Sequence, residues 1–307
     1  MNPEKGRIAA GFVLVSIIWG STWLVIKVGL GSVPPLFAVA MRFALASLII
    51  FIIMRLRGER LPTDRVAMKL YLTLAVLSYS FPFALVYWGE LYIPSGLASI
   101  LFAVYPFVVA IGSHFVLPGE RMNVMKMAGI VLGFTGVLMI FWGDLRPTEG
   151  SGLAMMGILA STLMQGSALI IIKKQSREIS PASLSLGGMS IGVVILSLLA
   201  FSFEDIGEVH FDARGIGSIL YLATFGTVVT FLTYYWLLKR VQAVYLSFVT
   251  LVTPALAVFL GAVLLGEQLE PNVFTGATAI CAGIVVANGR DIIAAISQHK
   301  ARIFSGN

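Results

Sequence analysis

Charged residues are scarce in this 307-residue sequence, because Asp, Glu, Lys and Arg together make up only 12% of it. Soluble domains carry about 25% charged residues, so the shortage excludes a chain whose whole surface faces water. Cysteine is almost absent as well: Cys281 stands alone in an apolar run, which excludes a disulfide and a thiolate metal site. The histidines His114, His210 and His299 are scattered, and no His-Glu-x-x-His motif is present. We therefore expect no metal, no cofactor, no catalytic residues and no enzyme activity.

A nucleotide-binding motif is also missing. The sequence contains no Gly-x-x-x-x-Gly-Lys-Ser/Thr loop of the kind that cradles phosphates. We therefore do not expect ATP-driven transport by this chain alone.

Long apolar stretches are abundant, since 58% of the residues are hydrophobic and the mean hydropathy is +0.93. Each stretch has about 20 residues and can cross a hydrocarbon core about 30 Å thick. The sequence predicts an all-α integral membrane protein with ten transmembrane helices. These lie near residues 8–28, 36–54, 70–91, 95–116, 124–142, 152–172, 181–201, 215–237, 243–265 and 272–288.

Lysine and arginine are distributed unevenly between the two sides of this predicted membrane domain. With the N-terminus in the cytoplasm, 17 of the 21 basic residues fall on the cytoplasmic side, and the outer loops receive only Arg146 and Arg214. The positive-inside rule therefore predicts cytoplasmic N- and C-termini, including a tail at 289–307. Topology accounts for the net charge of +6, so no nucleic-acid partner is expected. The acidic outer segment 202–214 is expected to be a solvated connector.

The sequence repeats itself with an offset of about 147 residues. The matches are Lys27 with Lys173 at 146, Gly119-Glu120 with Gly266-Glu267 and Gly136 with Gly283 at 147, and Ser99 with Ser247 and Pro106 with Pro254 at 148. This ordered series predicts two repeats, residues 8–142 and 152–288, with five helices each. Because five is odd, the second repeat is inverted, and the substrate site is expected near the membrane midplane between the halves.

Glycines recur in the fifth and tenth predicted spans, at Gly129, Gly133, Gly136, Gly276 and Gly283. Small residues let helices approach closely. We expect these glycines to pack the two spans against the bundle.

The motifs that carry a family resemblance are Trp19-Gly20-Ser21-Thr22, Pro35, Met41-Arg42-Phe43, Pro94-Ser95-Gly96-Leu97-Ala98, Pro106, Gly119-Glu120-Arg121, Pro254 and Gly266-Glu267-Gln268. In these the chain resembles the drug/metabolite transporter superfamily, specifically its ten-helix type with two EamA domains. The resemblance covers residues 8–288. It implies a multi-pass transporter in the inner membrane of a bacterium or archaeon that carries small metabolites, often exporting amino acids.

Arg42 is the most informative polar residue. It lies about seven residues inside the second span, where an unpaired charge in lipid costs about 2.5–3.5 kcal/mol or more. Its repeat position is Gly188, so the charge breaks the internal symmetry. One interpretation is an anchor for a substrate carboxylate in a central cavity. The other is a structural arginine that binds helix-end carbonyls or snorkels outward.

Aromatic side chains mark the predicted cavity. Tyr79, Phe83 and Tyr87 follow i, i+4, i+8 spacing and share one helix face, as expected for the wall of a site for an apolar or aromatic substrate. The other residues predicted to line the cavity are Trp19, Arg42, Ser99, Gln165, Tyr235 and Tyr245. Aromatic residues near span ends more often belong to the interface belt, as we expect for Trp88, Tyr92, Tyr221 and Trp236.

Pro82, Pro106 and Pro254 fall inside predicted spans and free backbone carbonyls there. We interpret them as kinks that shape gates, with simple packing bends as the alternative. Glu90 and His114 lie near span ends and are the candidate residues for proton coupling.

These features together predict a secondary transporter that exports small metabolites, amino acids or related amphipathic compounds, by alternating access. The alternative is a lipid or drug/quaternary-ammonium translocator of the same fold, and a channel or an intramembrane enzyme is less favoured. The expected partners are a small-molecule substrate and membrane lipids, with the chain as a monomer or weak homodimer.

Overall fold

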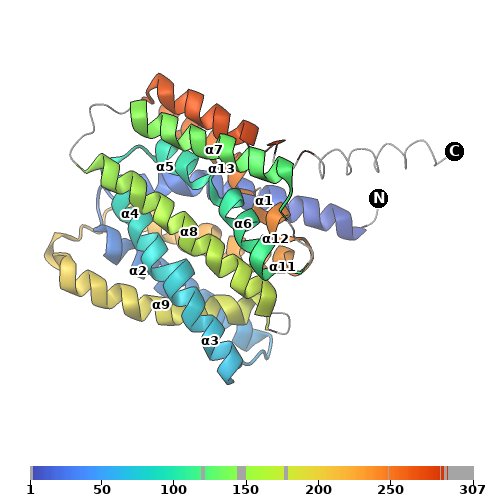
Figure 1. Ribbon diagram of the computed structural model, residues 1–307. Coiled ribbons are helices and arrows are strands. Elements are labelled where there is room, and N and C mark those ends of the chain that lie inside the picture. The colour runs from blue at the N-terminus through green and yellow to red at the C-terminus, as the bar shows by residue number, and fades with distance from the viewer. Residues whose placement is uncertain are drawn as a thin grey trace.

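The computed structural model describes residues 3–118, 122–143, 150–175, 179–247, 249–283, 285–286 and 289. Within these residues every regular element is a helix and no strand occurs, which confirms the predicted all-helical class. The helices lie side by side in one bundle (Figure 1). We call the end of the bundle where α1 begins the proximal end, and the opposite end the distal end.

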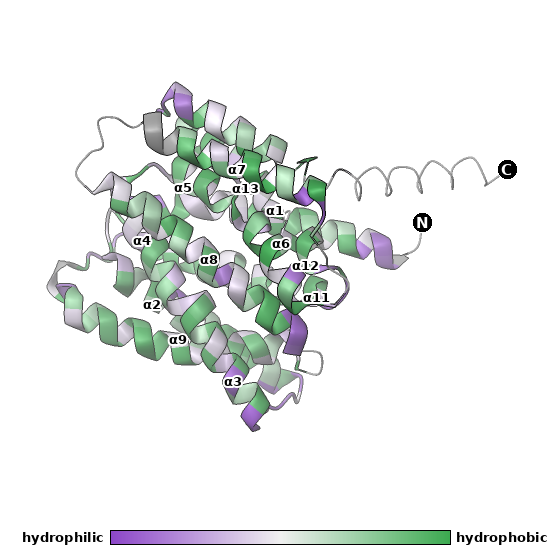
Figure 2. Ribbon diagram, in the orientation of Figure 1, coloured by the Kyte–Doolittle hydropathy of each residue, from purple (hydrophilic) through white to green (hydrophobic). Residues whose placement is uncertain are grey.

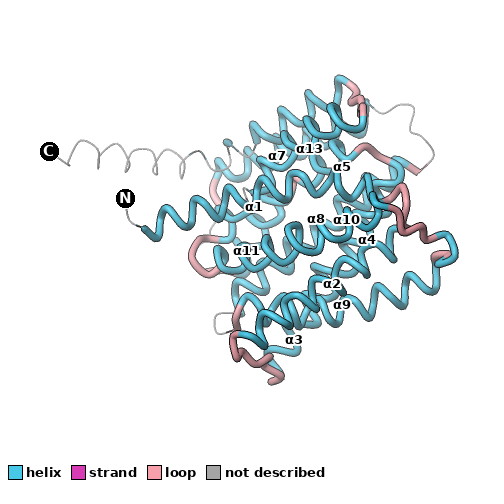
Figure 3. The backbone as a smooth tube through the Cα atoms, turned by 180° about the vertical axis from the view of Figure 1, so that it is seen from behind, coloured by secondary structure: helices cyan, strands magenta, loops and turns pink. Residues whose placement is uncertain are grey.

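The first half of the chain holds α1 (Pro3–Gly29), α2 (Pro35–Leu56), α3 (Arg65–Leu74), η1 (Ala75–Ser80), α4 (Phe81–Tyr92), α5 (Ser95–Phe102), α6 (Tyr105–Val116) and α7 (Val124–Gly143). The second half holds α8 (Ser151–Gln175), α9 (Pro181–Phe203), η2 (Ile206–Glu208), α10 (Ala213–Ala223), η3 (Thr224–Val229), α11 (Thr230–Leu238), α12 (Ala243–Ser247), α13 (Val249–Leu265) and a helix at 271–283. The repeat mates α1 and α8 run in opposite directions, as Figures 1 and 3 show from two sides.

Seven continuous helical segments of the described chain are long and apolar enough to cross a membrane. Three of them are composites, because α3–η1–α4, α5–α6 and α10–η3–α11 each form one span. The apolar helices Val124–Met139 and Val252–Leu265 are shorter. Large hydrophobic side chains such as Leu48, Leu138 and Leu198 are exposed on the outside of the bundle. Figure 2 shows hydrophobic residues along the helices and hydrophilic ones mainly toward helix ends, as a lipid-facing surface requires.

A π-helix interrupts the third span of each half at equivalent positions, η1 in the first and η3 in the second. In η3 the hydroxyl of Thr227 donates to the carbonyl of Leu222, five residues earlier, at 2.7 Å. Pro82, predicted as a kink, lies two residues after the end of η1 and cannot donate to the carbonyl of Ser78. No proline occupies the matching position after η3, so a π-helix forms there without one. Such turns are frequent at functional sites.

The prolines of the fourth and ninth spans behave differently. Before Pro106 the helix is interrupted at residues 103–104, between α5 and α6, whereas α13 continues through Pro254. The carbonyl of Thr250, which Pro254 leaves without its helical donor, accepts the hydroxyl of Thr253 at 3.2 Å. The matched pair of prolines therefore does not produce a matched pair of helix breaks.

Two carboxylates join the repeats at the distal end. Glu204, at the end of α9, accepts bonds from the backbone N–H groups of Leu36 (2.6 Å) and Phe37 (2.8 Å) at the start of α2. Glu267 accepts bonds from the N–H groups of Ser95 (2.9 Å) and Gly96 (3.2 Å) and from the Ser95 hydroxyl (2.9 Å) at the start of α5. The segment 202–214 is therefore more than the solvated connector that was expected, since Glu204 caps a helix of the other repeat.

We expect Glu267→Gln to destabilise the protein. A charge-assisted hydrogen bond contributes about 1.5–3 kcal/mol, and the carboxylate also complements the N-terminal end of the α5 dipole. The apparent melting temperature of the purified protein in detergent should fall by several degrees. Glu270→Gln, at an exposed neighbouring position, should leave it unchanged. Equal melting temperatures for the two variants would contradict the capping role.

Glycines bring α7 and the helix at 271–283 into backbone contact. A Cβ atom added at Gly136 would lie 2.4 Å from the carbonyl oxygen of Gly276, and one added at Gly283 would lie 2.5 Å from the carbonyl oxygen of Gly129. Gly136 and Gly283 are repeat mates, so the crossing is itself symmetric. Gly133 packs α7 against the Phe107 ring of α6, as predicted, and Gly129, Gly136, Gly276 and Gly283 pack the two helices on each other.

Candidate functional site

Two adjoining cavities lie in the middle of the bundle, between the two halves of the chain. Cavity 1 has a volume of about 530 Å³, part of it open to the surroundings, and is lined by Trp19, Thr22, Trp23, Ile26, Arg42, Phe83, Val86, Phe102, Gln165, Phe231, Thr250 and Thr253. Cavity 2 has a volume of about 410 Å³, again partly open, and is lined by Trp19, Leu74, Ser78, Phe102, Tyr105, Gln165, Ala168, Leu169, Ile172, Phe231, Tyr234, Tyr235 and Thr250. Trp19, Phe102, Gln165, Phe231 and Thr250 form a common wall. Both cavities are largely apolar, with a few convergent polar groups, as is usual for small-molecule sites.

The internal repeat relates the two cavities to each other. Most residues of cavity 1 have their repeat mate in cavity 2, at an offset of 146 or 148. The pairs are Thr22 with Ala168, Trp23 with Leu169, Ile26 with Ile172, Phe83 with Phe231, Val86 with Tyr234, Phe102 with Thr250, Thr253 with Tyr105, and Trp19 with Gln165. The two cavities are therefore equivalent halves of one central space, one toward the distal end and one toward the proximal end.

Arg42 is held against the π-helix of the other repeat. Its side chain is 1% exposed, and Nε donates to the Thr227 hydroxyl at 2.8 Å. One terminal nitrogen donates to the carbonyl of Gly226 at 3.0 Å, and the other reaches the Tyr87 hydroxyl at 3.3 Å. The guanidinium carbon lies 4.9 Å from the centre of the Phe83 ring. The side chain is thus fixed in one position on the wall of cavity 1.

No carboxylate of the described residues pairs with the guanidinium of Arg42. Among the described residues, the one ion pair joins Arg240 and Glu4 at the proximal end. Three of the five N–H groups of Arg42 donate to protein atoms, which leaves two for a molecule in cavity 1. A buried cation without a counter-ion is costly, so the site favours an anionic group. Arg42 thus binds a helix carbonyl and also lines cavity 1, and its role as a substrate anchor stays a prediction.

Aromatic rings form a large part of the remaining wall. Phe231 lies at the centre of this group, with ring centres 5.5 Å from Trp19, 5.2 Å from Tyr79 and 6.0 Å from Tyr235. Two pairs of tyrosine hydroxyls link the repeats, Tyr79 with Tyr235 at 3.0 Å and Tyr105 with Tyr234 at 3.1 Å. The walls are suited to an apolar or aromatic group.

The residues predicted for the cavity are mostly close together. Trp19, Arg42, Phe83 and Gln165 line cavity 1, and Tyr235 lines cavity 2. Tyr79 and Tyr87 are buried behind the wall and support Tyr235 and Arg42 respectively. Ser99 lines neither cavity, because its hydroxyl donates to the Gly96 carbonyl within α5. The side chain of Tyr245 lies outside the described part of the structure.

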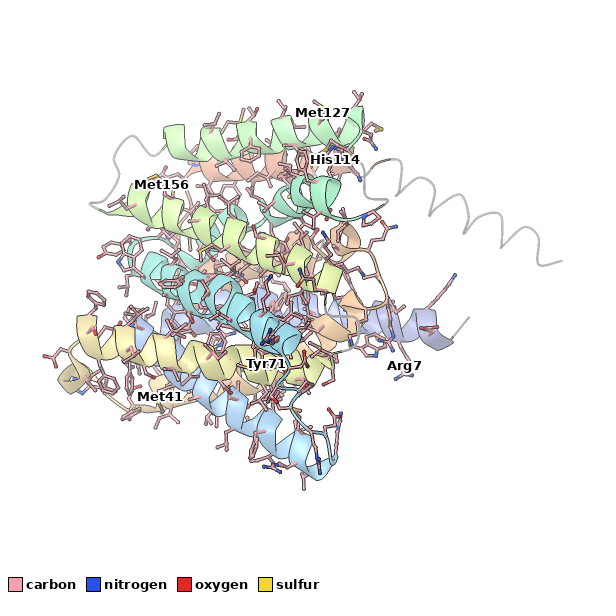
Figure 4. The ribbon with its side chains drawn as sticks, turned by 60° about the horizontal axis from the view of Figure 1, so that its bottom comes forward. Arg7, Met41, Tyr71, His114, Met127 and Met156 are labelled. Carbon is pink, nitrogen blue, oxygen red and sulfur yellow. The ribbon has the colours of Figure 1, made fainter. Side chains whose placement is uncertain are left out.

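The two coupling candidates lie at opposite ends of the bundle. Glu90 is in the last turn of α4, toward the distal end, and is fully buried. His114 is in the last turn of α6, at the proximal end beside the start of α7 (Figure 4). Its Nδ1 accepts the backbone N–H of Met122 at 2.9 Å. The two residues therefore do not form one relay.

Several wall residues were not predicted from the sequence, in particular Phe231, Phe102 and Thr250. A usable signal existed for Phe231, because it is the repeat mate of Phe83 and lies four residues before Tyr235.

A Gly-x-Ser-x-Gly pattern also occurs at residues 188–192. It lies inside α9 with Ser190 exposed, so it is not a nucleophile elbow, which needs a strand-to-helix turn.

In each repeat, one lysine donates hydrogen bonds to the carbonyls at the end of a helix. The ammonium group of Lys27 donates to the carbonyls of Glu90 and, at 3.1 Å, Ile93 at the end of α4. The ammonium group of its mate Lys173 donates to the carbonyls of Leu238 and, at 2.6 Å, Val241 at the end of α11. A cation at a helix C-terminus satisfies free carbonyls and complements the helix dipole.

We expect Lys27→Met and Lys173→Met to destabilise the protein to a similar degree. Each change keeps the length of the side chain but leaves buried carbonyls without a donor, at a cost of about 1–3 kcal/mol. The melting temperature in detergent should fall by several degrees in both, whereas Lys69→Met, at an exposed position of α3, should match the wild type. A change in only one of the two variants would show that the lysines are not equivalent.

The comparisons with known proteins agree with this architecture. A family model described as the EamA-like transporter family matches residues 7–142 and 152–289. The uncharacterized transporter YoaV of Bacillus subtilis is 30% identical, over 91% of this chain and 95% of that protein. An Escherichia coli protein named "probable amino-acid metabolite efflux pump" is 29% identical, over 93% of this chain and 95% of that protein. A crystal structure with 17% sequence identity has a TM-score of 0.70 and covers 92% of this chain and 97% of its own, which shows a shared fold.

Proposed function

The chain belongs to the EamA-like transporter family, and on that premise we propose that it exports small amphipathic metabolites, foremost amino acids with apolar side chains, by alternating access. The observation that carries the substrate class is Arg42, a buried guanidinium without a carboxylate partner on the wall of an aromatic cavity. A substrate carboxylate would supply the missing counter-ion, and the rings of Trp19, Phe83 and Phe231 would surround the apolar part. The efflux pump names of the Escherichia coli and Salmonella typhimurium relatives support export as the direction.

We propose ten transmembrane spans with both termini in the cytoplasm. Basic residues gather at the proximal end, where α2, α8 and α11 finish and α3 begins, for example Arg55, Arg65, Lys174 and Arg240. Arg214 is one of the few basic residues at the distal end. The positive-inside rule then puts the proximal end in the cytoplasm. The helices α7, α12–α13 and 271–283 supply the three spans beyond the seven long ones.

The symmetry of the cavities supports alternating access. Inverted repeats that exchange their conformations open a central site first to one side and then to the other. Cavities 1 and 2 are repeat mates that share one wall, so such an exchange would open one while it closes the other.

The alternative substrates are less well matched. A quaternary ammonium compound would face Arg42, which would repel it, and nothing acidic lines cavity 1 to offset that. A lipid phosphate would satisfy Arg42, so a lipid translocator is the nearer rival.

The experiment is counterflow into proteoliposomes that contain the full-length protein, with a panel of labelled amino acids and a fluorescent phospholipid. We expect saturable counterflow of amino acids with apolar side chains, and slower counterflow of lysine and arginine. Scrambling of the phospholipid without amino-acid flux would favour the lipid translocator. Flux equal to that of empty vesicles for the whole panel would refute the proposed substrate class.

A further inference from the structure

Glu90 carries a carboxyl group in an unusual position. The side chain is 0% exposed, in the last turn of α4, and within the described structure neither carboxylate oxygen has a hydrogen-bond partner. An ionised carboxylate that is buried without donors is among the most costly groups in a protein interior. The neutral carboxylic acid avoids most of this cost.

The charged and titratable groups around Glu90 come from several elements of the bundle. They are Lys27 of α1, Arg42 of α2, Tyr87 of α4 itself and Glu267 of the segment after α13. Lys27 donates to the backbone carbonyls of Glu90 and Ile93, and Glu267 accepts the N–H groups at the start of α5. Around Gly89, α8 contributes the apolar side chain of Ile158 and a backbone carbonyl. None of these groups donates a hydrogen bond to the carboxyl group of Glu90.

The other repeat shows what this position accommodates. The repeat mate of Glu90 is Leu238, and the repeat mate of Lys27 is Lys173. Lys173 donates to the carbonyl of Leu238 just as Lys27 donates to that of Glu90. The same backbone arrangement with the same lysine therefore holds an apolar side chain in one half and a carboxyl group in the other. A neutral side chain fits both positions.

We propose that Glu90 is a proton-binding site: the carboxylate takes up one proton from water and becomes a neutral carboxylic acid, and it releases the proton to water in the reverse step. No other co-reactant is needed, because only the proton is gained and lost. The site has no counterpart in the second repeat, where Leu238 cannot titrate.

Protonation of Glu90 affects the anion site at Arg42. Tyr87, whose hydroxyl lies 3.3 Å from a terminal nitrogen of Arg42, is one turn before Glu90 on α4. An ionised Glu90 would lower the positive potential at Arg42 and repel a substrate carboxylate. At the effective dielectric constant of about 20 used for protein sites, charges about 10 Å apart change an affinity roughly tenfold. Protonated Glu90 therefore favours substrate binding, so the proton and the substrate would cross together, and export would follow the outward gradient of the substrate. This part of the inference rests on the proposed function.

The protonation step can be tested without any substrate. Infrared difference spectra of the full-length protein in liposomes, recorded between pH 6 and pH 9, report the C=O stretch of protonated carboxyl groups. We expect a band that is present at the lower pH and disappears at the higher pH in the wild type and in Glu270→Gln, but is absent in Glu90→Gln. A band that Glu90→Gln leaves unchanged would overturn the assignment of Glu90 as a proton-binding site.

The effect on binding is tested by counterflow of labelled L-phenylalanine at the same pH values. The wild type and Glu270→Gln should lose about three- to tenfold in apparent affinity as pH rises, whereas Glu90→Gln should keep the low-pH affinity throughout. An apparent affinity that still falls with rising pH in Glu90→Gln would overturn the coupling between Glu90 and Arg42. Absence of amino-acid counterflow in the wild type at every pH would instead refute the proposed function, while the infrared band would still decide the protonation of Glu90.

Discussion

Replacement of Arg42 by alanine should reduce amino-acid counterflow by about 100-fold or more. Removing one partner of a buried charge pair costs 2–5 kcal/mol, and the substrate carboxylate would lose its only cationic partner on the wall of cavity 1. Arg42→Lys should recover only part of the flux, because a single ammonium group cannot replace the bonds of a planar guanidinium to Thr227 and Gly226 and still reach the substrate.

The control for this prediction separates transport from folding. Arg57→Ala removes an exposed arginine from the end of α2 and should transport at the wild-type rate. Elution profile and melting temperature in detergent should show that Arg42→Lys is folded. If Arg42→Ala remains folded and transports amino acids like the wild type, Arg42 is not the substrate anchor.

Alanine at Gly136 or Gly283 should cause the largest loss of stability among conservative substitutions. In both cases the new Cβ atom would lie within 2.5 Å of a backbone carbonyl of the partner helix, which cannot rotate away as a side chain could. Overpacking costs about 1–3 kcal/mol, and this exceeds the helix propensity gained on replacing glycine with alanine, which is at most about 1 kcal/mol.

The melting temperature in detergent should therefore fall by several degrees for Gly136→Ala and for Gly283→Ala. Gly217→Ala provides the matched control, because a Cβ atom at Gly217 of α10 meets nothing within 4 Å. There only the gain in helix propensity remains, and stability should be unchanged or slightly higher. A stability of Gly136→Ala equal to that of Gly217→Ala would show that α7 is not packed on the helix at 271–283 as described.

The sequence predicted the helices well because length and hydropathy alone determine which segments can span a membrane. The helix at Pro181–Phe203, for example, begins at the predicted residue and ends two residues later. The internal features of the spans were not predictable in this way. Hydropathy is continuous through η1 and η3, so it gives no sign of either π-helix. Proline was an uneven guide, because the helix breaks just before Pro106 but continues through Pro254.

The cavity wall was predicted only in part, and the reasons differ from residue to residue. Arg42 was ambiguous from sequence, because Thr227 and Gly226 lie about 185 residues further along the chain and nothing local identifies them as its partners. Ser99 was predicted from its repeat position, yet its hydroxyl satisfies a carbonyl of its own helix, which short polar side chains in apolar helices often do. Glu90 lies near a span end, and nothing local in the sequence shows that its carboxyl group is buried without a hydrogen-bond partner.

The matching lysines Lys27 and Lys173 bear on how the two repeats arose. Two halves that place the same ammonium group under the same helix end, at opposite ends of the bundle, indicate descent from one duplicated five-helix segment, with the lysine already present in the ancestor. Arg42 opposite Gly188 and Glu90 opposite Leu238 are then points at which the two halves diverged after the duplication. The ancestral segment would have supplied the scaffold, and the charges that distinguish its two descendants would have given the transporter its chemistry.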